Sequence, residues 1–384
     1  MPVVCIRPAI HIRKISSLFA IGLLLLTGIA QAAPITVTDI AGRQVTLPQP
    51  AKRVMLADAR ALLALNILHP QEPLKNIIAW DSSLKVKAPD LLAAYEKKFP
   101  QISKIPTFSN PYVNDFSVEN AVVMKPDLIV FDIGLMAKLK TSGVLANLEK
   151  IGIPILFIDF RQQPLTNTVA SMRLLGQVFD EQPNADAFIQ FYQQRLNLVR
   201  QRVATLKPEQ RPSVFIERSA GMKGERCCNT FGKGSFGQFI DAAGGNNIGS
   251  SLFPEMGGEI NVEQMIVSNP DFYLMTGADW GRGHKGTQAV PLGYATDVAT
   301  AQKKLTPLMN RTGLNVLTAV KEKRVMAIYH QFYDTPFNFI AVEAIAKFLH
   351  PDLFKDIDPQ ADIEMAHQKF TALDYSGVFW ITAQ

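Results

Sequence analysis

The chain has 384 residues, of which 47% are hydrophobic and 19% are charged, a composition that supports globular cores and excludes a disordered polymer. Its 39 basic and 34 acidic residues give a formal net charge of +5, and three of the basic residues lie within the first 32 positions. Without those positions 36 basic residues face 34 acidic ones, a net charge of +2, so the basic balance typical of nucleic-acid-binding proteins is absent.

The first 32 residues have the pattern of a secretory signal peptide. Three basic residues precede the apolar run LFAIGLLLLTGIA, and Ala30 and Ala32 frame a small-x-small cleavage site. The run is too short and wrongly flanked for a membrane span. We therefore expect residues 1–32 to be removed and the mature protein to be exported.

The residues that follow alternate predicted strands and helices. ITVTDIAGRQVTLP predicts a hairpin, and the runs RVMLA, NIIAW, DLIVF and IPILFID predict strands. Helical patterns separate them in ARALLALNIL, PDLLAAYEKKF and GVLANLEKI. This alternation predicts an α/β lobe over residues 33–182 with a mainly parallel sheet.

A long helix is predicted next, over residues 183–207. The stretch PNADAFIQFYQQRLNLVRQRVATL has apolar residues at helical spacing, with no glycine and no internal proline. At 1.5 Å per residue such a helix is roughly 35 Å long, enough to connect two lobes. Strand and helix patterns then resume in SVFIE, GQFIDAAG, NVEQMIV, FYLMT, GLNVLTAV, RVMAIYH and PFNFIAVEAIAKFL, which predicts a second α/β lobe over residues 208–384.

One segment occurs in both predicted lobes. SVENAVVMKPDLIVF begins at Ser117 and NVEQMIVSNPDFYLM begins at Asn261, which places Glu119 and Glu263 at matching positions 144 residues apart. Such self-similarity indicates that one supersecondary unit is used twice. Each glutamate lies in the first turn of a predicted helix, where an acidic side chain also complements the helix dipole.

Arginines and aromatic residues follow the predicted strands. The carboxyl ends of parallel strands share one edge of the sheet, and ligands of open α/β sheets bind outside that edge. Guanidinium groups bind anionic oxygens and rings cover apolar surface, so the set suits a bulky, anionic, partly aromatic ligand. Solvated rim arginines, a core tryptophan and an exposed loop histidine are the alternative interpretations of its members. The predicted ligand-binding residues are Arg60, Trp80, Arg161, Arg218, Trp280, Arg282, His284 and Tyr333.

Cys227 and Cys228 are the only cysteines beyond the predicted signal peptide. The surrounding GERCCNTFGKGSFG does not have the spacing of a phosphate-binding loop, and it lacks the further thiolates or histidines of a zinc or iron–sulfur site. In an oxidising compartment the pair predicts a vicinal disulfide or inert buried thiols, while a thiol nucleophile with a histidine partner is the rival interpretation. The remaining histidines are dispersed, so we expect no protein-bound metal and no resident cofactor.

The complete pattern resembles the class III periplasmic substrate-binding proteins of ABC importers, a family that serves ferric siderophores, haem and vitamin B12. VTDIAGRQVTLPQPAKRVM resembles the family's opening, VENAVVMKPDLIV and VEQMIVSNPDFYLM its two lobe signatures, and FIDAAGGNNIG its second-lobe glycine motif. The resemblance implies two Rossmann-like lobes joined by one long helix, with little closure and no catalysis. It also implies a monomer that docks on an inner-membrane ABC permease through Glu119 and Glu263.

The cargo is less well specified by the sequence. HQFYDTPFNFIAVEAIAKFLHPDLF resembles the C-terminal segment of the family's iron-complex members, and the arginines fit an anionic chelate. A ferric siderophore is therefore the first expectation, with haem, a corrinoid or a nickel chelate as alternatives. A secreted thiol enzyme that uses Cys227 or Cys228, and a sensory protein without a permease, are the rival function classes.

Overall fold

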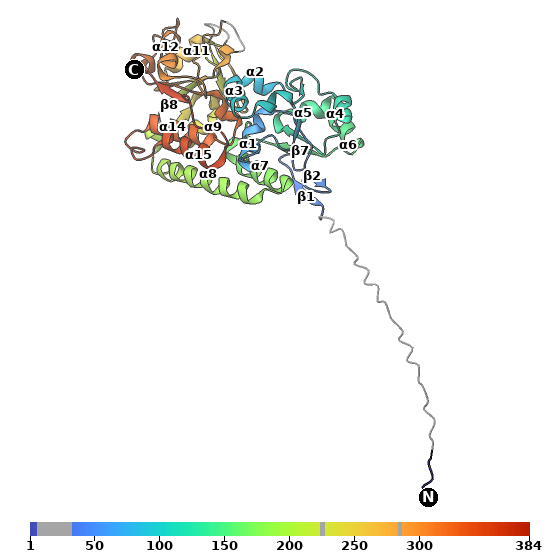
Figure 1. Ribbon diagram of the computed structural model, residues 1–384. Helices are drawn as coiled ribbons and strands as arrows, with labels where there is room; N and C mark the ends of the chain where they lie inside the picture. Colours follow the sequence, from blue (N-terminus) through green and yellow to red (C-terminus); the bar gives the residue numbers. More distant parts are fainter. Residues whose placement is uncertain (6–32, 223–226, 283–285) are drawn as a thin grey trace. The chain divides into compact units, whose positions relative to one another are not determined.

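The computed structural model describes residues 1–5, 33–222, 227–282 and 286–384. Residues Pro34–Gln384 form one compact unit, which carries the fold (Figure 1). Most of the predicted signal peptide and its cleavage site lie in residues 6–32, outside the described residues. Across the described ranges, no helix combines the length and the apolar character needed to cross a membrane.

The first half of the larger unit is built around a parallel sheet. Its five described strands have the order β5-β4-β3-β6-β7, and every neighbouring pair is parallel. The antiparallel hairpin β1–β2 precedes it. These strands are β1 Ile35–Thr38, β2 Gln44–Leu47, β3 Val54–Leu56, β4 Ile77–Asp81, β5 Thr107–Phe108, β6 Leu128–Asp132 and β7 Ile155–Ile158. The helices of this half are η1 Ala59–Ala61, α1 Leu62–Leu68, α2 Ser83–Lys87, α3 Pro89–Lys98, η2 Pro100–Lys104, α4 Val118–Met124, η3 Ile133–Leu135, α5 Met136–Thr141 and α6 Val144–Lys150.

The second half contains a mixed sheet. In its described part β8, β12 and β13 form a parallel centre, while β9, β11 and β14 add antiparallel strands and β10 pairs with β8. These strands are β8 Ser213–Glu217, β9 Asn229–Phe231, β10 Asn246–Asn247, β11 Gly257–Glu259, β12 Phe272–Gly277, β13 Val325–Tyr329 and β14 Trp380–Thr382. The helices are η4 Pro208–Gln210, α9 Phe236–Ala242, α10 Ile248–Leu252, α11 Val262–Ser268, η5 Trp280–Arg282, α12 Val298–Met309, α13 Thr318–Lys321, η6 His330–Asp334, α14 Asn338–Leu349 and α15 Pro359–Phe370.

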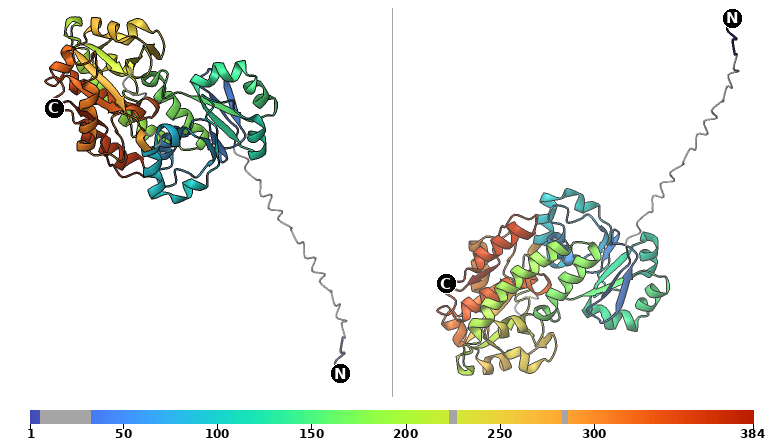
Figure 2. Two further views of the ribbon diagram at one scale, coloured as in Figure 1. Left: turned by 90° about the horizontal axis from the view of Figure 1, so that it is seen from above. Right: turned by 90° about the horizontal axis from the view of Figure 1, so that it is seen from below.

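Two packed helices connect the halves. The predicted long helix is α8, Gln182–Val203, which ends four residues earlier than expected because the chain turns ahead of Pro208. The preceding helix α7, Pro164–Phe179, was not predicted, although Pro164 at its first position is a helix-start signal. Helix α8 packs against α7 and α14, and Figure 2 shows these helices running side by side in green and red.

The expected α/β fold with mainly parallel sheets and a long connecting helix is confirmed, whereas two local predictions are wrong. GLNVLTAV was expected to be one helix, but only α13 is helical there, and Arg311 and Leu314 participate in consecutive turns. Helix α12 was not expected, because Pro307 interrupts its pattern. The lobe boundaries at 33–182, 183–207 and 208–384 stay predictions, since residues 34–384 form a single compact unit.

Candidate functional site

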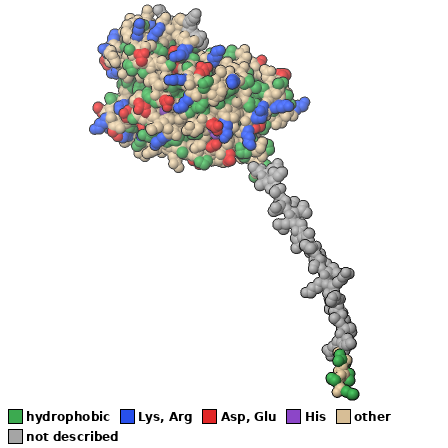
Figure 3. Space-filling view, viewed as in Figure 1, with side chains coloured by type: hydrophobic (Ala, Val, Ile, Leu, Met, Phe, Trp, Pro, Cys, Tyr) green, Lys and Arg blue, Asp and Glu red, His purple; other side chains and the backbone are tan. Residues whose placement is uncertain are grey.

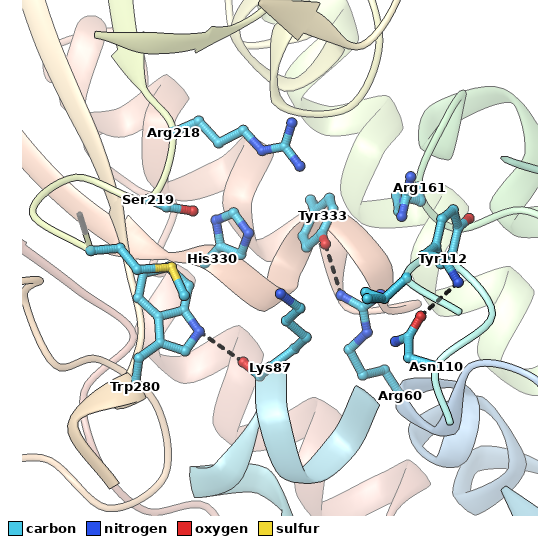
Figure 4. Close-up of a pocket in the computed structure, with 12 residues that line it drawn as sticks. Arg60, Lys87, Asn110, Tyr112, Arg161, Arg218, Ser219, Trp280, His330 and Tyr333 are labelled. Carbon is cyan, nitrogen blue, oxygen red and sulfur yellow. Dashed lines mark hydrogen bonds between the residues drawn. The ribbon is translucent and has the colours of Figure 1, made fainter. Parts of the chain in front are cut away.

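A cavity of about 260 Å³ lies where the carboxyl ends of strands from both sheets converge (Figure 4). Each lining segment directly follows a strand or the helix after it: β3 leads to Arg60, β7 to Arg161, β8 to Arg218 and β13 to His330. This is the edge at which open α/β sheets bind ligands. The lining residues are Arg60, Lys87, Asn110, Tyr112, Val113, Arg161, Arg218, Ser219, Met222, Trp280, His330 and Tyr333.

The charge of Arg60 is already balanced within the protein. Its Nη2 lies 2.6 Å from Asp58 Oδ2 and 2.5 Å from Asp334 Oδ2, and these carboxylates outweigh burial and raise its pKa. Its Nη1 donates to the hydroxyl of Tyr333 at 2.7 Å. Arg60 therefore positions the ring of Tyr333 in the cavity wall and joins the first half of the chain to η6.

Two other arginines have no such partner. Among the described residues no carboxylate oxygen lies within 4.0 Å of a guanidinium nitrogen of Arg161 or Arg218. Arg161 stacks on the ring of Tyr112, 4.3 Å from its centroid, and its buried Nε has no hydrogen-bond partner. Arg218 lies 5.3 Å from the ring centroid of Phe231. Both guanidinium groups thus have hydrogen-bonding capacity left for a ligand.

The clustered cations shift the pKa values of their neighbours. Burial lowers the pKa of Arg218, and repulsion from Arg161 and Arg60 acts in the same direction. Burial, with repulsion from Arg60 and Arg218, likewise lowers the pKa of Lys87. The pKa of His330 falls well below its usual range through burial and these cations, so its imidazole is neutral near pH 7. The cavity holds excess positive charge that an anion would relieve.

Aromatic rings and an amide fix one wall of the cavity. Trp280 Nε1 donates to the backbone oxygen of Lys87 at 2.9 Å, and the side-chain amide of Gln331 donates to the same oxygen. His330 lies with its ring centroid 5.1 Å from Trp280 and 4.6 Å from Tyr333. These contacts hold residues from α2, η5 and η6 in one place, as Figure 4 shows.

Five of the eight predicted ligand-binding residues line the cavity: Arg60, Arg161, Arg218, Trp280 and Tyr333. Of the other three, Trp80 and Arg282 do not. Trp80 lies outside the cavity wall, because its side chain is buried in the hydrophobic core beside β3. Arg282 is half exposed and pairs with Asp279. His284 lies outside the described residues.

Several lining residues were missed or not selected from the sequence. Lys87 ends the short helix α2, so a search directly after strands did not reach it. Tyr112 follows β5, a two-residue strand too short to leave a pattern. His330 was recognised at a strand end but not chosen as a ligand residue. A search for aromatic and basic residues one helix beyond each strand would have found Lys87.

Cys227 and Cys228 lie on a neighbouring cavity of about 320 Å³ that shares Arg218, Ser219 and Met222 with the first. Their sulfur atoms are joined as a vicinal disulfide, and Cys228 is fully buried. Within the described ranges no group of three or more histidine, cysteine or acidic side chains is arranged to hold a metal ion. The disulfide thus lies beside the basic cavity, outside its wall.

Known proteins match this chain over most of its length. The family model described as "Periplasmic binding protein" matches residues 72–331. The "TroA-like Periplasmic Binding Protein FepB" from Veillonella parvula has a structure similar to this one, with a TM-score of 0.82, 28% identity, and coverage of 91% of this chain and 100% of that one.

Two more distant relatives also align. The molybdate-binding protein MolA of Haemophilus influenzae is 19% identical over 94% of this chain and 98% of its own, and its molybdate-bound structure superposes with a TM-score of 0.67 over 89% and 99% of the two chains. An uncharacterized ABC transporter substrate-binding lipoprotein of Bacillus subtilis, YvrC, is 21% identical over 84% of this chain and 88% of its own. Such proteins are transport components, a class distinct from enzymes. The family match, the fold and a cavity between two α/β halves show that this chain belongs to the periplasmic binding protein family of ABC transporters.

Proposed function

We propose that this protein captures an anionic metal chelate of the ferric-siderophore type in the periplasm and delivers it to an inner-membrane ABC permease. One observation carries the proposal: Arg161, Arg218 and Lys87 place three cations without carboxylate partners beside the rings of Tyr112 and Tyr333. Asp132 and Asp334 partly offset the charge of Arg161 from beyond 4.0 Å, whereas Arg218 and Lys87 have no such carboxylate among the described residues and still need a balancing negative charge. The ligand is expected to bring that charge.

The chemistry of the cations favours oxygen ligands that carry negative charge. A guanidinium presents paired N–H donors that match two neighbouring oxygens, as in a carboxylate or a catecholate, and charge-assisted hydrogen bonds are about twice as strong as neutral ones. Aromatic rings next to these donors favour a ligand with an apolar or aromatic body. A metal chelate with several anionic oxygens and an organic backbone combines both properties.

The size of the cavity restricts the ligand further. Pockets for drug-sized molecules measure roughly 300–1,000 Å³, and this one measures about 260 Å³. A whole siderophore complex would place its metal-binding oxygens among the cations and extend its outer part toward the neighbouring cavity at the vicinal disulfide. Haem and corrinoids fit less well, since haem brings only two carboxylates for three cations and either macrocycle is larger than the cavity of about 260 Å³.

A small oxyanion of the molybdate type is the second candidate. The cavity volume suits such a ligand without any extension, and a distant relative is named a molybdate-binding protein. Buried guanidinium groups and the backbone N–H groups after a strand bind tetrahedral anions well. A nickel chelate remains within the first class and differs only in the metal.

Titration of the purified mature protein tests both candidates. Trp280 lies in the cavity wall, so tryptophan fluorescence should report binding. Ferric catecholate, ferric hydroxamate, ferric citrate, nickel–histidine, haemin, cobalamin, molybdate and chloride are the probes, with chloride as the blank. We expect at least one ferric chelate to bind with a Kd at or below about 1 µM. Molybdate as the only tight ligand would establish the second candidate, and no tight ligand at all would refute the proposal.

Delivery and state of assembly form the second part of the proposal. The protein works as a monomer, and Glu119 on α4 and Glu263 on α11 contact cationic pockets of the permease. Acidic and basic side chains are mixed on the face in Figure 3, which gives no broad single-sign surface for nucleic acid. Reconstituted transport with Glu119→Gln plus Glu263→Gln should fall while chelate affinity stays unchanged. Unchanged transport would favour a sensory protein.

A further inference from the structure

Helices α4 and α11 begin and end with the same capping geometry. Ser117 Oγ accepts from the backbone N–H of Asn120 at 3.1 Å, and Asn261 Oδ1 accepts from that of Gln264 at 2.7 Å, so each helix begins with a side-chain cap. The two helices end alike, since the C-cap residues Lys125 and Asn269 both have left-handed backbone angles. Residues at equivalent positions therefore point in equivalent directions relative to their strands.

Each helix buries one position and exposes the opposite face. Ala121 and Met265 are the fully buried residues. On the outer face Val123 is 78% exposed and Val267 is 85% exposed, at matching positions. Both lie four residues after the glutamate of the same helix, so valine and glutamate side chains are neighbours on one helical surface. Each helix thus presents a carboxylate next to an isopropyl group.

Helix stability does not explain these valines. Valine is a poorer helix former than alanine, leucine or lysine, and an exposed valine gains nothing from packing within the chain. A single exposed apolar residue is ordinary on a protein surface. Two at equivalent positions, each beside a matched glutamate, form a repeated surface feature.

The glutamates have no cation of their own. Among the described residues no lysine, arginine or histidine nitrogen lies within 4.0 Å of a carboxylate oxygen of Glu119 or Glu263. The carboxylate of Glu119 accepts a hydrogen bond from the hydroxyl of Ser117 at 3.1 Å. A partner that fits these surfaces must supply a cation and, one helical turn away, an apolar contact. That chemistry fits a permease surface with two such sites better than it fits a soluble ligand.

We propose that Val123 and Val267 are apolar anchors of the permease-docking surface, each acting together with the neighbouring glutamate. The inference rests on the proposed function and deepens it. The carboxylates steer and orient the complex through charge, which salt screens. The valines contribute burial of apolar area, which is insensitive to moderate salt and slows dissociation. Neither valine lines the ligand cavity.

The matched experiment replaces Val123 and Val267 with threonine, which keeps the branched shape and replaces one methyl group at each site with a hydroxyl. The control replaces Val298 and Val316, which are 51% and 49% exposed elsewhere on the surface, in the same way. Binding to the permease in nanodiscs is measured by surface plasmon resonance at 50 and 300 mM NaCl. The double variant should lose about 15-fold in affinity, by a similar factor at both salt concentrations, since each buried methyl contributes about 4-fold. The control pair should change affinity less than 2-fold.

Glu119→Gln plus Glu263→Gln serves as the comparison, because its loss of affinity should shrink at high salt. If the double Glu→Gln variant loses affinity for the permease and the double Val→Thr variant does not, the proposal of apolar anchors is overturned and the proposed function still stands. Equal losses for the Val123/Val267 pair and the Val298/Val316 pair would also overturn them. Chelate affinity of every variant is measured in parallel, so failure of the ligand proposal shows separately as absence of chelate binding by the wild type.

Discussion

Replacement of Arg218 by methionine should raise the stability of the free protein and lower its affinity for the ligand. In the free protein this guanidinium is largely buried, faces the cations Arg161 and Arg60, and has a lowered pKa through burial and their repulsion. Methionine keeps a long side chain against Phe231 and removes the charge. The structure therefore predicts effects of opposite sign on stability and on binding.

The two magnitudes follow from the surroundings. Removing a buried cation that lacks a partner relieves about 1–2 kcal/mol, less about 0.5 kcal/mol for the lost cation–π contact. The net gain is roughly 1 kcal/mol, or about 2 °C in the melting temperature of a protein of this size. The complex loses a charge-assisted contact to an anionic oxygen, about 1.5–3 kcal/mol, which corresponds to a 10- to 150-fold weaker Kd.

Arg60→Met is the matched control, since it makes the same chemical change in the same cavity. Arg60 balances Asp58 and Asp334, so its removal leaves buried carboxylates without their cation and should cost about 3–5 kcal/mol of stability. The melting temperature should then fall by several degrees. The two variants thus distinguish an arginine that binds ligand, Arg218, from an arginine that stabilises the fold, Arg60.

Differential scanning calorimetry of the ligand-free proteins gives the melting temperature of each variant. Isothermal titration with the tightest chelate gives the Kd of each variant. The reasoning is refuted if Arg218→Met lowers the melting temperature of the free protein as Arg60→Met does. It is equally refuted if Arg218→Met leaves the Kd within 2-fold of wild type, because the unpaired charge would then contribute nothing to ligand capture.

Three further predictions concern other groups. Asp132 ends β6, where it accepts from the hydroxyl of the cavity residue Tyr112, and burial raises its pKa to about 6. The wild type should therefore bind an anionic chelate progressively less well as pH rises through 6, and Asp132→Asn should bind about 3- to 10-fold tighter than wild type at pH 8 in the same titration. Burial, reinforced by Asp362, raises the pKa of Glu343 to about 9. Its folded-state penalty is absent below pH 4.5 and grows as pH rises toward 9, so Glu343→Gln should raise the melting temperature at pH 8 by roughly 2–5 °C and leave it unchanged at pH 4. Replacement of both Cys227 and Cys228 by serine should keep the Kd for the chelate within about 3-fold, because the anionic oxygens bind in the basic cavity and only the outer part of the chelate reaches the cavity that the disulfide lines.

Each of these expectations has a contrary outcome. A ratio of wild-type to Asp132→Asn affinity that does not change between pH 5 and pH 8 would show that this carboxylate stays ionised or lies too far from the ligand. A lower melting temperature for Glu343→Gln at pH 8 would show that the buried group is ionised and paired. Loss of all ligand binding in the double serine variant would show that the disulfide contacts the ligand. Turnover of a thiol substrate by the wild type would support the alternative that the protein is a thiol enzyme.

The order of the elements was largely readable from the sequence. Period-2 and period-3.6 apolar patterns reflect burial on one face of an element, and burial is strong in this protein, so the strands around β3, β6, β8 and β12 and the helix α8 were predicted close to their observed positions. The repeat containing Glu119 and Glu263 was also visible, since it depends on local caps and helix starts. Helix α7 and the short strand β5 were missed, because weak or brief patterns do not stand out from their surroundings.

Only the tertiary structure decided which of the candidate side chains meet. Arg60, Arg161 and Arg218 looked equivalent in sequence, each an arginine just beyond a strand. Folding gave Arg60 two carboxylates, while no carboxylate of the described residues lies within 4.0 Å of either of the other two guanidinium groups. Trp80 and Trp280 likewise looked alike, yet one fills the core and the other closes the cavity. A strand pattern places a residue at an edge of the sheet. Whether that residue carries a free charge depends on side chains from elements more than 200 positions away, such as Tyr333 for Arg60, and local sequence has no record of those contacts.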